Sequence, residues 1–112
     1  MNKDVTVFLK HILECADFIE ARTKNISQEE FEKDDLVQDG VIRRIEIIGE
    51  AIRHIPGDFR NKYKEIPWID IMDTRNKLIH DYFGVDLKLV WQMAKKDVPE
   101  LKKQILDIID NI

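Results

Sequence analysis

The chain has 112 residues, a net charge of −4 and a charged fraction of 36%. This length suits one compact domain, residues 1–112, with a real hydrophobic core and no room for a second domain. No apolar run approaches the eighteen or more residues that a membrane-spanning helix needs, so we expect no membrane segment. The excess of acidic residues, which is confined to residues 1–50, argues against a protein that coats nucleic acid in bulk.

The N-terminus carries charges throughout and lacks a small-residue cleavage site, so it does not resemble a signal peptide. A single cysteine, Cys15, excludes an internal disulfide and fits a reducing cytoplasm, which is the expected location. Cys15 falls on the apolar side of its segment, which favours a small buried hydrophobic residue over a nucleophile.

The first segment predicts a long helix followed by a short one. Between Val5 and Ile19, apolar residues recur at intervals of three and four, which is typical of a helix with one buried face. Ser27 and Glu30 then form a capping box, in which each side chain can satisfy the other's backbone N–H. The capping box predicts the start of a short helix around Phe31.

A second long helix is expected from Leu36 to Ile55, and the proline–glycine pair at 56–57 should end it. Gly49 lies within its apolar stripe, at a cost of about 1 kcal/mol of helix propensity. We therefore expect another helix to approach closely at this glycine. Ile47 and Ala51 fall on the opposite side, so this helix should also pack there, against a second subunit or another helix of the same chain.

The second half of the chain predicts three more helical segments. Pro67 should occupy the first turn of a helix from Trp68 to Tyr82. Asp86 can cap a further turn or two, and Pro99 should open the last helix. The residues of that helix that should face inward are Leu101, Ile105, Ile108, Ile109 and Ile112. With no strand-like alternation of any length, the sequence predicts an all-α bundle of four or five helices.

The densest basic stretch lies between the second long helix and the helix at 68–82. It contains Arg53, Arg60, Lys62 and Lys64 against a single acid, Asp58. This stretch is either an ordinary exposed connector or a weak contact for a polyanion such as RNA, and composition alone leaves both open.

Arg75 stands at the centre of an apolar stripe. On a helical wheel, it is flanked by Trp68, Met72 and Ile79 on one side and by Ile71, Leu78 and Tyr82 on the other. An unpaired buried guanidinium would be very costly. Arg75 therefore extends to solvent along its aliphatic stem, pairs with a carboxylate in the core, or lines a cleft that admits an anion.

Asn76 and His80 project from one flank of the same predicted helix, four residues apart. Histidine can move a proton near neutral pH, arginine offers a fixed charge and a forked donor to phosphate, and asparagine can orient groups by hydrogen bonding. These three residue types suit phosphoryl chemistry. However, Arg75 and His80 are five residues apart, about 140° around the helix. Two copies of the helix meeting at a two-fold axis would solve this geometry, so a dimer is expected.

The motif Arg75-x4-His80-x-Tyr82 resembles that of the HEPN superfamily, specifically its HepT-like toxin branch. Four further segments are similar to that family in the same order, so the resemblance covers nearly the whole chain. These segments are "VIRRIEIIGEA" at 41–51, "IPW" at 66–68, "RNKLIHDYFGVD" at 75–86 and "VW" at 90–91.

The resemblance implies an up-and-down HEPN bundle that forms homodimers and cleaves RNA without a metal, where the two motif helices meet. It implies catalytic roles for Arg75 and His80 and a supporting role for Asn76. His80 would assist attack by a ribose 2′-hydroxyl or protonate the leaving oxygen, and Arg75 would stabilise charge on the phosphate. Glu50 would pair with Arg75 or position the site, although a plain solvated glutamate fits the sequence equally well. The basic residues of 53–64 would help to bind RNA.

The resemblance also implies a partner, a minimal nucleotidyltransferase antitoxin of the MntA type, which would neutralise the toxin by adenylylating Tyr82. No cofactor is expected beyond this covalently attached AMP. A competing hypothesis is a non-catalytic HEPN module that binds nucleotides as the partner of a nucleotidyltransferase, and a purely structural helical adaptor is a third. A metallohydrolase is disfavoured, because His11, His54 and His80 are far apart in sequence and show no metal-ligand spacing.

Overall fold

The computed structural model describes residues 3–80 and 84–112, and this part of the chain contains helices and no strands. The long helices are α1 (Lys3–Thr23), α3 (Asp35–Arg53) and α5 (Trp68–His80), followed by the continuous helical run of α6 (Leu87–Gln92), the π-helical turn η1 (Met93–Asp97) and α7 (Val98–Asp110). Two short helices, α2 (Gln28–Glu32) and α4 (Gly57–Lys62), lie in the connections. The prediction of an all-α bundle is confirmed.

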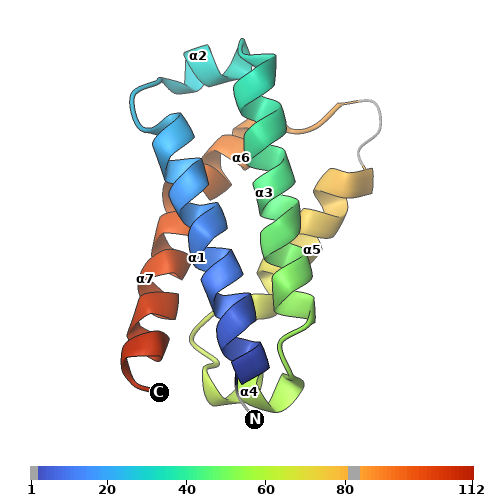
Figure 1. Cartoon of the computed structure of the whole chain (residues 1–112). Helices are drawn as coiled ribbons and strands as arrows, with labels where there is room; N and C mark the ends of the chain where they lie inside the picture. Colours follow the sequence, from blue (N-terminus) through green and yellow to red (C-terminus); the bar gives the residue numbers. More distant parts are fainter. Residues whose placement is uncertain (1–2, 81–83) are drawn as a thin grey trace.

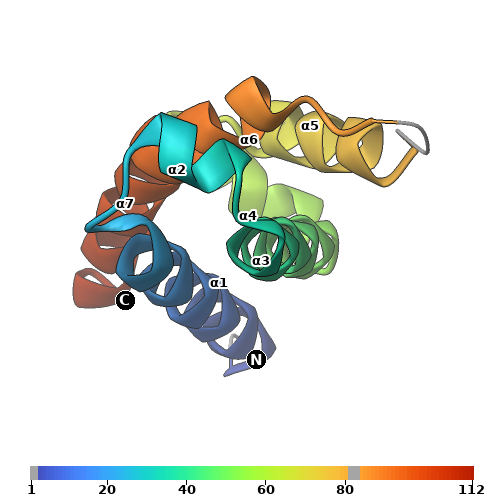
Figure 2. The ribbon, with the colours of Figure 1, turned by 90° about the horizontal axis from the view of Figure 1, so that it is seen from above.

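The long helices run alternately up and down, so that the two ends of the chain lie at the same end of the bundle (Figure 1). α1 packs between α3 and α7, and α3 packs on its other side against α5 (Figure 2). α5 is therefore an outer helix that contacts the bundle mainly through α3. The largest fully buried side chains of the core are Phe31, Leu9, Ile12, Ile19, Ile45, Ile48, Ile52, Ile55, Ile66, Leu101, Ile105 and Val41.

The capping box predicted before α2 is present. The Ser27 hydroxyl accepts a hydrogen bond from the Glu30 backbone at 3.1 Å, and the Glu30 carboxylate accepts one from the Ser27 backbone at 2.9 Å. These bonds direct the chain so that Phe31 is fully buried. Cys15 is also buried, as predicted, and its burial raises the pKa of its thiol.

α3 buries its apolar stripe as predicted and also buries part of its other side within the same chain. Ala51 is 5% exposed and Ile47 is half-buried. The N-terminus of α3 is capped by Asp34, whose carboxylate accepts a hydrogen bond from the Val37 backbone at 3.1 Å. Neighbouring helices of this chain thus account for most of the burial of Ala51 without a second subunit.

The prediction that Pro99 opens a separate last helix is wrong. Asp86 caps α6 as expected, but the helical run then continues through η1 into α7, with Pro99 as its second residue. Proline has no N–H to donate, and its ring crowds the carbonyl four residues earlier, so the wider π-helical turn accommodates it without ending the helix. The prediction that Ile112 faces inward is also wrong, because it lies beyond the end of α7 and is 57% exposed.

The basic stretch at 53–64 is not an irregular connector, because it contains α4. No residue of α4 is buried, and Pro56 occupies the N-cap position, where its missing N–H is not needed. Pro67 lies one residue before α5 and accepts the hydrogen bond of Ile71 through its carbonyl. None of the helices in the described part of the chain has the length and apolar character needed to cross a membrane.

Candidate functional site

Gly49 in α3 is the reason that Arg75 in α5 can lie against the bundle. A Cβ atom built on Gly49 would lie 2.6 Å from Cγ of Arg75 and 2.9 Å from its Cβ and Cδ. The close approach predicted at Gly49 is therefore made by the aliphatic stem of Arg75. With this stem covered, the guanidinium group lies near the surface, and the side chain is 21% exposed.

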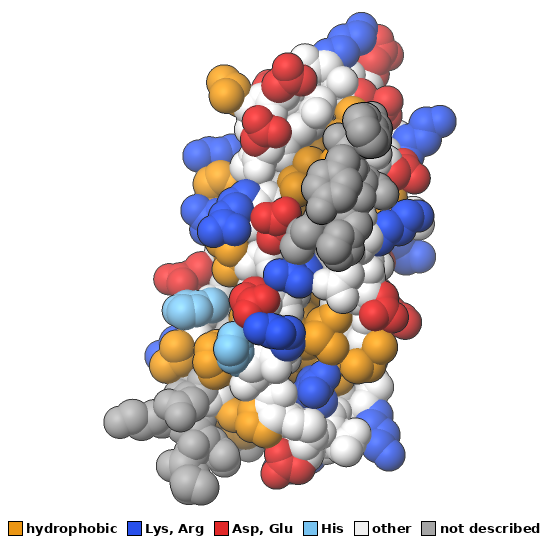
Figure 3. All heavy atoms as spheres, turned by 90° about the vertical axis from the view of Figure 1, so that its right-hand side faces the viewer, with side chains coloured by type: hydrophobic (Ala, Val, Ile, Leu, Met, Phe, Trp, Pro, Cys, Tyr) orange, Lys and Arg blue, Asp and Glu red, His pale blue; other side chains and the backbone are white. Residues whose placement is uncertain are grey.

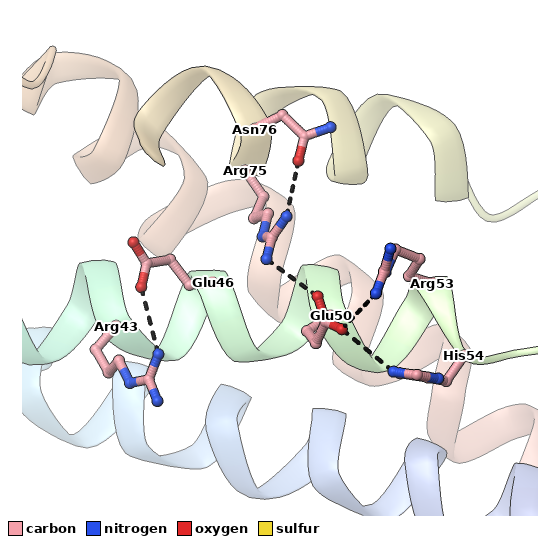
Figure 4. Close-up of polar contacts among 7 residues, drawn as sticks. All are labelled: Arg43, Glu46, Glu50, Arg53, His54, Arg75 and Asn76. Carbon is pink, nitrogen blue, oxygen red and sulfur yellow. Dashed lines mark hydrogen bonds and ion pairs between the residues drawn. The ribbon is translucent and has the colours of Figure 1, made fainter. Parts of the chain in front are cut away.

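The guanidinium group of Arg75 is held by two side chains. Nη2 donates a hydrogen bond to Oε1 of Glu50 at 3.1 Å, and Nη1 donates to Oδ1 of Asn76 at 2.8 Å (Figure 4). The remaining ring-side nitrogen, Nε, is buried and has no hydrogen-bond partner. Because Glu50 is 40% exposed, the ion pair lies at the surface of the molecule and not within its core.

Glu50 connects Arg75 to two further side chains at the end of α3. Its other oxygen, Oε2, accepts a hydrogen bond from Arg53 Nη2 at 3.1 Å and lies 3.2 Å from His54 Nε2 (Figure 4). Burial raises the pKa of Glu50. The hydrogen bond and charge of Arg53, the hydrogen bond with His54 and the charge of Arg75 outweigh this effect, so that the net pKa is below its ordinary value. Glu50 is therefore a carboxylate at neutral pH and fixes Arg75 from one side.

These groups surround a hollow of about 360 Å³ between α1, α3 and α5. Its lining includes Arg75, Glu50, Glu46 and Arg43, together with two histidines, His11 and His54. Histidine, basic and acidic side chains gather on the face of the molecule that carries α3 and α5 (Figure 3). The Arg43–Glu46 pair, at 3.6 Å, lies farther along α3 (Figure 4).

The two histidines of the hollow were missed as site residues by sequence reasoning, which treated them as far apart. The His54 ring stacks on Phe8 of α1 at a centroid distance of 5.4 Å, which places His54 in the same hollow as His11. The four-residue spacing between Glu50 and His54 was an available signal, since such residues are neighbours on a helix. Nothing in the sequence linked His11 to this place. Within residues 3–80 and 84–112, no three His, Cys, Asp or Glu side chains form a group that could hold a metal ion.

The remaining motif residues are only partly covered by the structure. His80 is the last residue of α5, but the position of its side chain is not among those described, and Tyr82 lies outside the described residues. Asn76 is exposed and in contact with Arg75, as its hydrogen bond shows. The structure thus brings together Arg75, Asn76 and Glu50.

The four basic residues predicted to bind RNA do not form one patch. Arg53 belongs to the Glu50 cluster, and the Lys62 ammonium lies 5.7 Å from the centre of the Tyr63 ring. Arg60 and Lys64 line a separate pocket between α4 and the start of α5. Sequence proximity alone grouped these side chains, and the turn of α4 distributes them over different surfaces.

Chemically, the arrangement around Arg75 suits the recognition of an anion. A guanidinium group has five N–H donors, and only two of the hydrogen bonds seen here use them. The free donors can bind phosphate oxygens by charge-assisted hydrogen bonds, which are about twice as strong as neutral ones. Glu50 and Asn76 hold the group in place before any ligand arrives.

Comparison with known proteins places this geometry in a family. The family model described as "Ribonuclease HepT-like" matches residues 12–108. A Methanocaldococcus jannaschii protein named "Gamma-glutamylcyclotransferase and putative RNase" is 50% identical over 112 residues, which cover the whole of this chain and half of that protein. A "Putative RNase" of Caldanaerobacter subterraneus subsp. tengcongensis is 43% identical over 102 residues, 91% of each chain. A "Probable ribonuclease HepT" of Thermococcus cleftensis is 46% identical over 102 residues, 91% of this chain and 93% of that protein. No solved structure was found to match.

Proposed function

Because this chain belongs to the HepT-like ribonuclease family, we propose that it is the toxin of a HEPN toxin–antitoxin system. In this proposal it is an endoribonuclease that cleaves RNA without a metal, at a cleft shared by two subunits. The observation that carries the proposal is the placement of Arg75, which Glu50 and Asn76 hold at the edge of a hollow on the motif helix.

Arg75 would stabilise the negative charge that develops on the phosphate during cleavage. A guanidinium on the apolar face of a helix costs stability unless its donors are satisfied, and its Nε is left without a partner here. A fixed cation whose donors are oriented in advance is what stabilisation of a charged transition state requires. The unsatisfied donor is therefore available to a phosphate oxygen of the substrate.

His80 would move a proton in the same reaction. The ribose 2′-oxygen forms a bond to the adjacent phosphorus, the bond from phosphorus to the 5′-oxygen breaks, and a 2′,3′-cyclic phosphate and a 5′-hydroxyl result. His80 either accepts the proton of the 2′-hydroxyl or donates a proton to the leaving 5′-oxygen. A positioned acid or base of this kind typically contributes 10²- to 10⁴-fold to the rate.

A homodimer would bring Arg75 of one subunit near His80 of the other. The two residues lie five positions apart on α5, about 140° around its axis, so one copy of the helix directs them to different places. Mixing Arg75→Ala and His80→Ala chains tests this arrangement. Each variant alone should be inactive, and mixed dimers should recover roughly a quarter of the wild-type activity, because half the dimers are mixed and each has one complete site. Mixing that restores no activity would contradict a site composed from two subunits.

The antitoxin would be a nucleotidyltransferase of the MntA type that transfers AMP to Tyr82. Tyr82 follows Arg75 by seven residues, so on a continued helix it would lie on nearly the same side, and a phosphate-bearing adduct would occupy the path of the substrate. The test is the intact mass of the chain coexpressed with a nucleotidyltransferase from its genomic neighbourhood. The proposal predicts an adenylate increment that maps to Tyr82 and disappears in Tyr82→Phe.

Expression of the chain in a bacterial host tests the activity as a toxin. Growth should stop with the wild-type chain and continue with His80→Ala at equal protein level. Growth arrest by both chains would contradict the proposed role of His80. Binding of ATP or AMP by the isolated chain, without RNA cleavage by the dimer, would favour a nucleotide-binding module instead.

A further inference from the structure

We propose a second anion site, a pocket between α4 and the start of α5 that binds a phosphate group of the RNA strand beside the one to be cleaved. The identity of this ligand rests on the proposed function, whereas the pocket itself is a property of the fold. Its volume is about 360 Å³. It is lined by Gly57, Arg60, Asn61, Lys64, Ile66, Pro67, Trp68, Ile69 and Asp70.

The two cations of this pocket are unpaired. Among the described residues, no carboxylate lies within ion-pair distance of Arg60 or Lys64, although acidic residues outnumber basic ones 22 to 18 in the chain. Other cations of the protein, such as Arg75 and Lys102, do have acidic partners. Asp70 is the one acidic residue in the lining, so the side chains of the pocket carry a net positive charge.

Arg60 also contains a buried donor without a partner. Its Nε is shielded from solvent and makes no hydrogen bond, while Nη2 lies 4.0 Å from the position of a Cβ built on Gly57. A buried donor left unsatisfied costs about 1–3 kcal/mol, so an arriving anion oxygen would remove an existing penalty as well as add an attraction. The same feature, a buried and unsatisfied arginine Nε, occurs at Arg75 in the candidate active site.

The walls of the pocket are fixed before any ligand binds. The Trp68 indole N–H donates to the backbone carbonyls of Arg60 at 3.2 Å and Tyr63 at 3.1 Å. Trp68 is itself 5% exposed, so it anchors the end of α4 to the first turn of α5. Binding to a preformed site avoids the cost of ordering a loop, which favours a weak ligand such as a single phosphate group.

The position of the pocket suits a strand that also reaches Arg75. Trp68 and Arg75 are seven residues apart on α5, which places them on the same side of the helix and about 10 Å apart along its axis. A single strand with one phosphate at Arg75 can therefore place a neighbouring phosphate between Arg60 and Lys64. The strand would then be held at two points, and the pocket would set which bond lies beside Arg75.

The test is binding of a fluorescently labelled single-stranded RNA, followed by anisotropy, to chains that also carry His80→Ala and cannot cleave. Arg60→Gln combined with Lys64→Gln should weaken binding roughly tenfold, since one or two charge-assisted contacts are lost. The slope of log K against log salt should decrease by about 0.7 for one phosphate released. Lys24→Gln combined with Lys103→Gln removes the same charge from exposed positions elsewhere and is the matched control. Asp70→Asn should tighten binding.

Unchanged affinity in the pocket variant, or equal losses in the pocket variant and the control, would overturn the proposal, as would a His80→Ala chain that binds no RNA. Circular dichroism of each variant verifies its fold, and the opposite effect of Asp70→Asn remains informative if the double variant unfolds. Titration with inorganic phosphate separates the two sources of this chemistry. Phosphate binding that needs Arg60 and Lys64, combined with unaffected RNA binding, would assign the pocket to free phosphate and contradict the RNA assignment. Because binding is measured without cleavage, failure of the nuclease proposal would leave this result readable.

Discussion

Replacing Gly49 by alanine tests how α3 and α5 hold Arg75. The added methyl group would lie 2.6–2.9 Å from three carbons of Arg75. These are the Cβ, Cγ and Cδ atoms near the base of the side chain, so a rotation at its tip does not relieve the overlap. Either α5 moves away from α3, or Arg75 changes rotamer and loses its hydrogen bond to Glu50.

The magnitude follows from two opposing effects. Inserting a methyl group into a packed interface costs typically about 1–3 kcal/mol, while glycine to alanine within a helix gains about 1 kcal/mol. The net loss of stability is therefore about 1 kcal/mol, within a range of about 0–2. For a domain of this size, 1 kcal/mol corresponds to about 4 °C in Tm.

Gly40 provides the matched control, because it lies in the same helix and its added Cβ would lie 3.3 Å from the edge of the Phe18 ring. Gly40→Ala should be neutral or stabilised by up to about 1 kcal/mol, since a small ring shift relieves the contact. Thermal and urea unfolding of both variants give the comparison. Gly49→Ala should also lose RNA cleavage and Gly40→Ala should retain it. A Gly49→Ala protein at least as stable as Gly40→Ala would refute the packing argument.

Two further predictions concern the pH dependence of stability. The pKa of Glu50 is lowered, so its stabilisation is present above the ordinary value of 4.5 and is lost as the pH falls through the lower, folded-state pKa. The difference in urea midpoint between wild type and Glu50→Gln should therefore shrink below about pH 4.5, and a constant difference would contradict the network around Arg75. Lys102 has a raised pKa, chiefly through its hydrogen bond to Asp17 at 2.8 Å. The advantage of wild type over Lys102→Met should be complete below its ordinary pKa of 10.5 and disappear at higher pH, and persistence in strong alkali would exclude this ion pair as its source.

Local signals predicted much of the fold. The capping box of Ser27 and the cap of Asp86 each depend on residues a few positions apart, and both are present. Gly49 indicated a close contact, because a glycine in an apolar helical stripe needs a packing reason. Pro99 was misleading, because the same residue can open a helix or follow a π-helical turn, and packing on both sides of it decides between them.

The candidate site depends on contacts that no local pattern reveals. Glu50 and Arg75 are separated by 25 positions, and the wheel position of each left their pairing open. His11 and His54 share a hollow only because α1 lies beside α3. Arg53, Arg60, Lys62 and Lys64 looked like one basic cluster, and the turn of α4 separates them. Periodicity therefore predicted which faces are buried, while the partners of the polar groups required the tertiary structure.

Cleavage of a labelled RNA by the purified chain in excess EDTA tests most directly the claim that Arg75 and His80 suffice for catalysis. The account predicts that the wild-type chain cleaves under these conditions and leaves a 2′,3′-cyclic phosphate. Arg75→Ala or His80→Ala should each lower the single-turnover rate by roughly 10²- to 10⁴-fold. Cleavage that stops in EDTA and returns with added metal, or a His80→Ala chain that cuts at the wild-type rate, would contradict it.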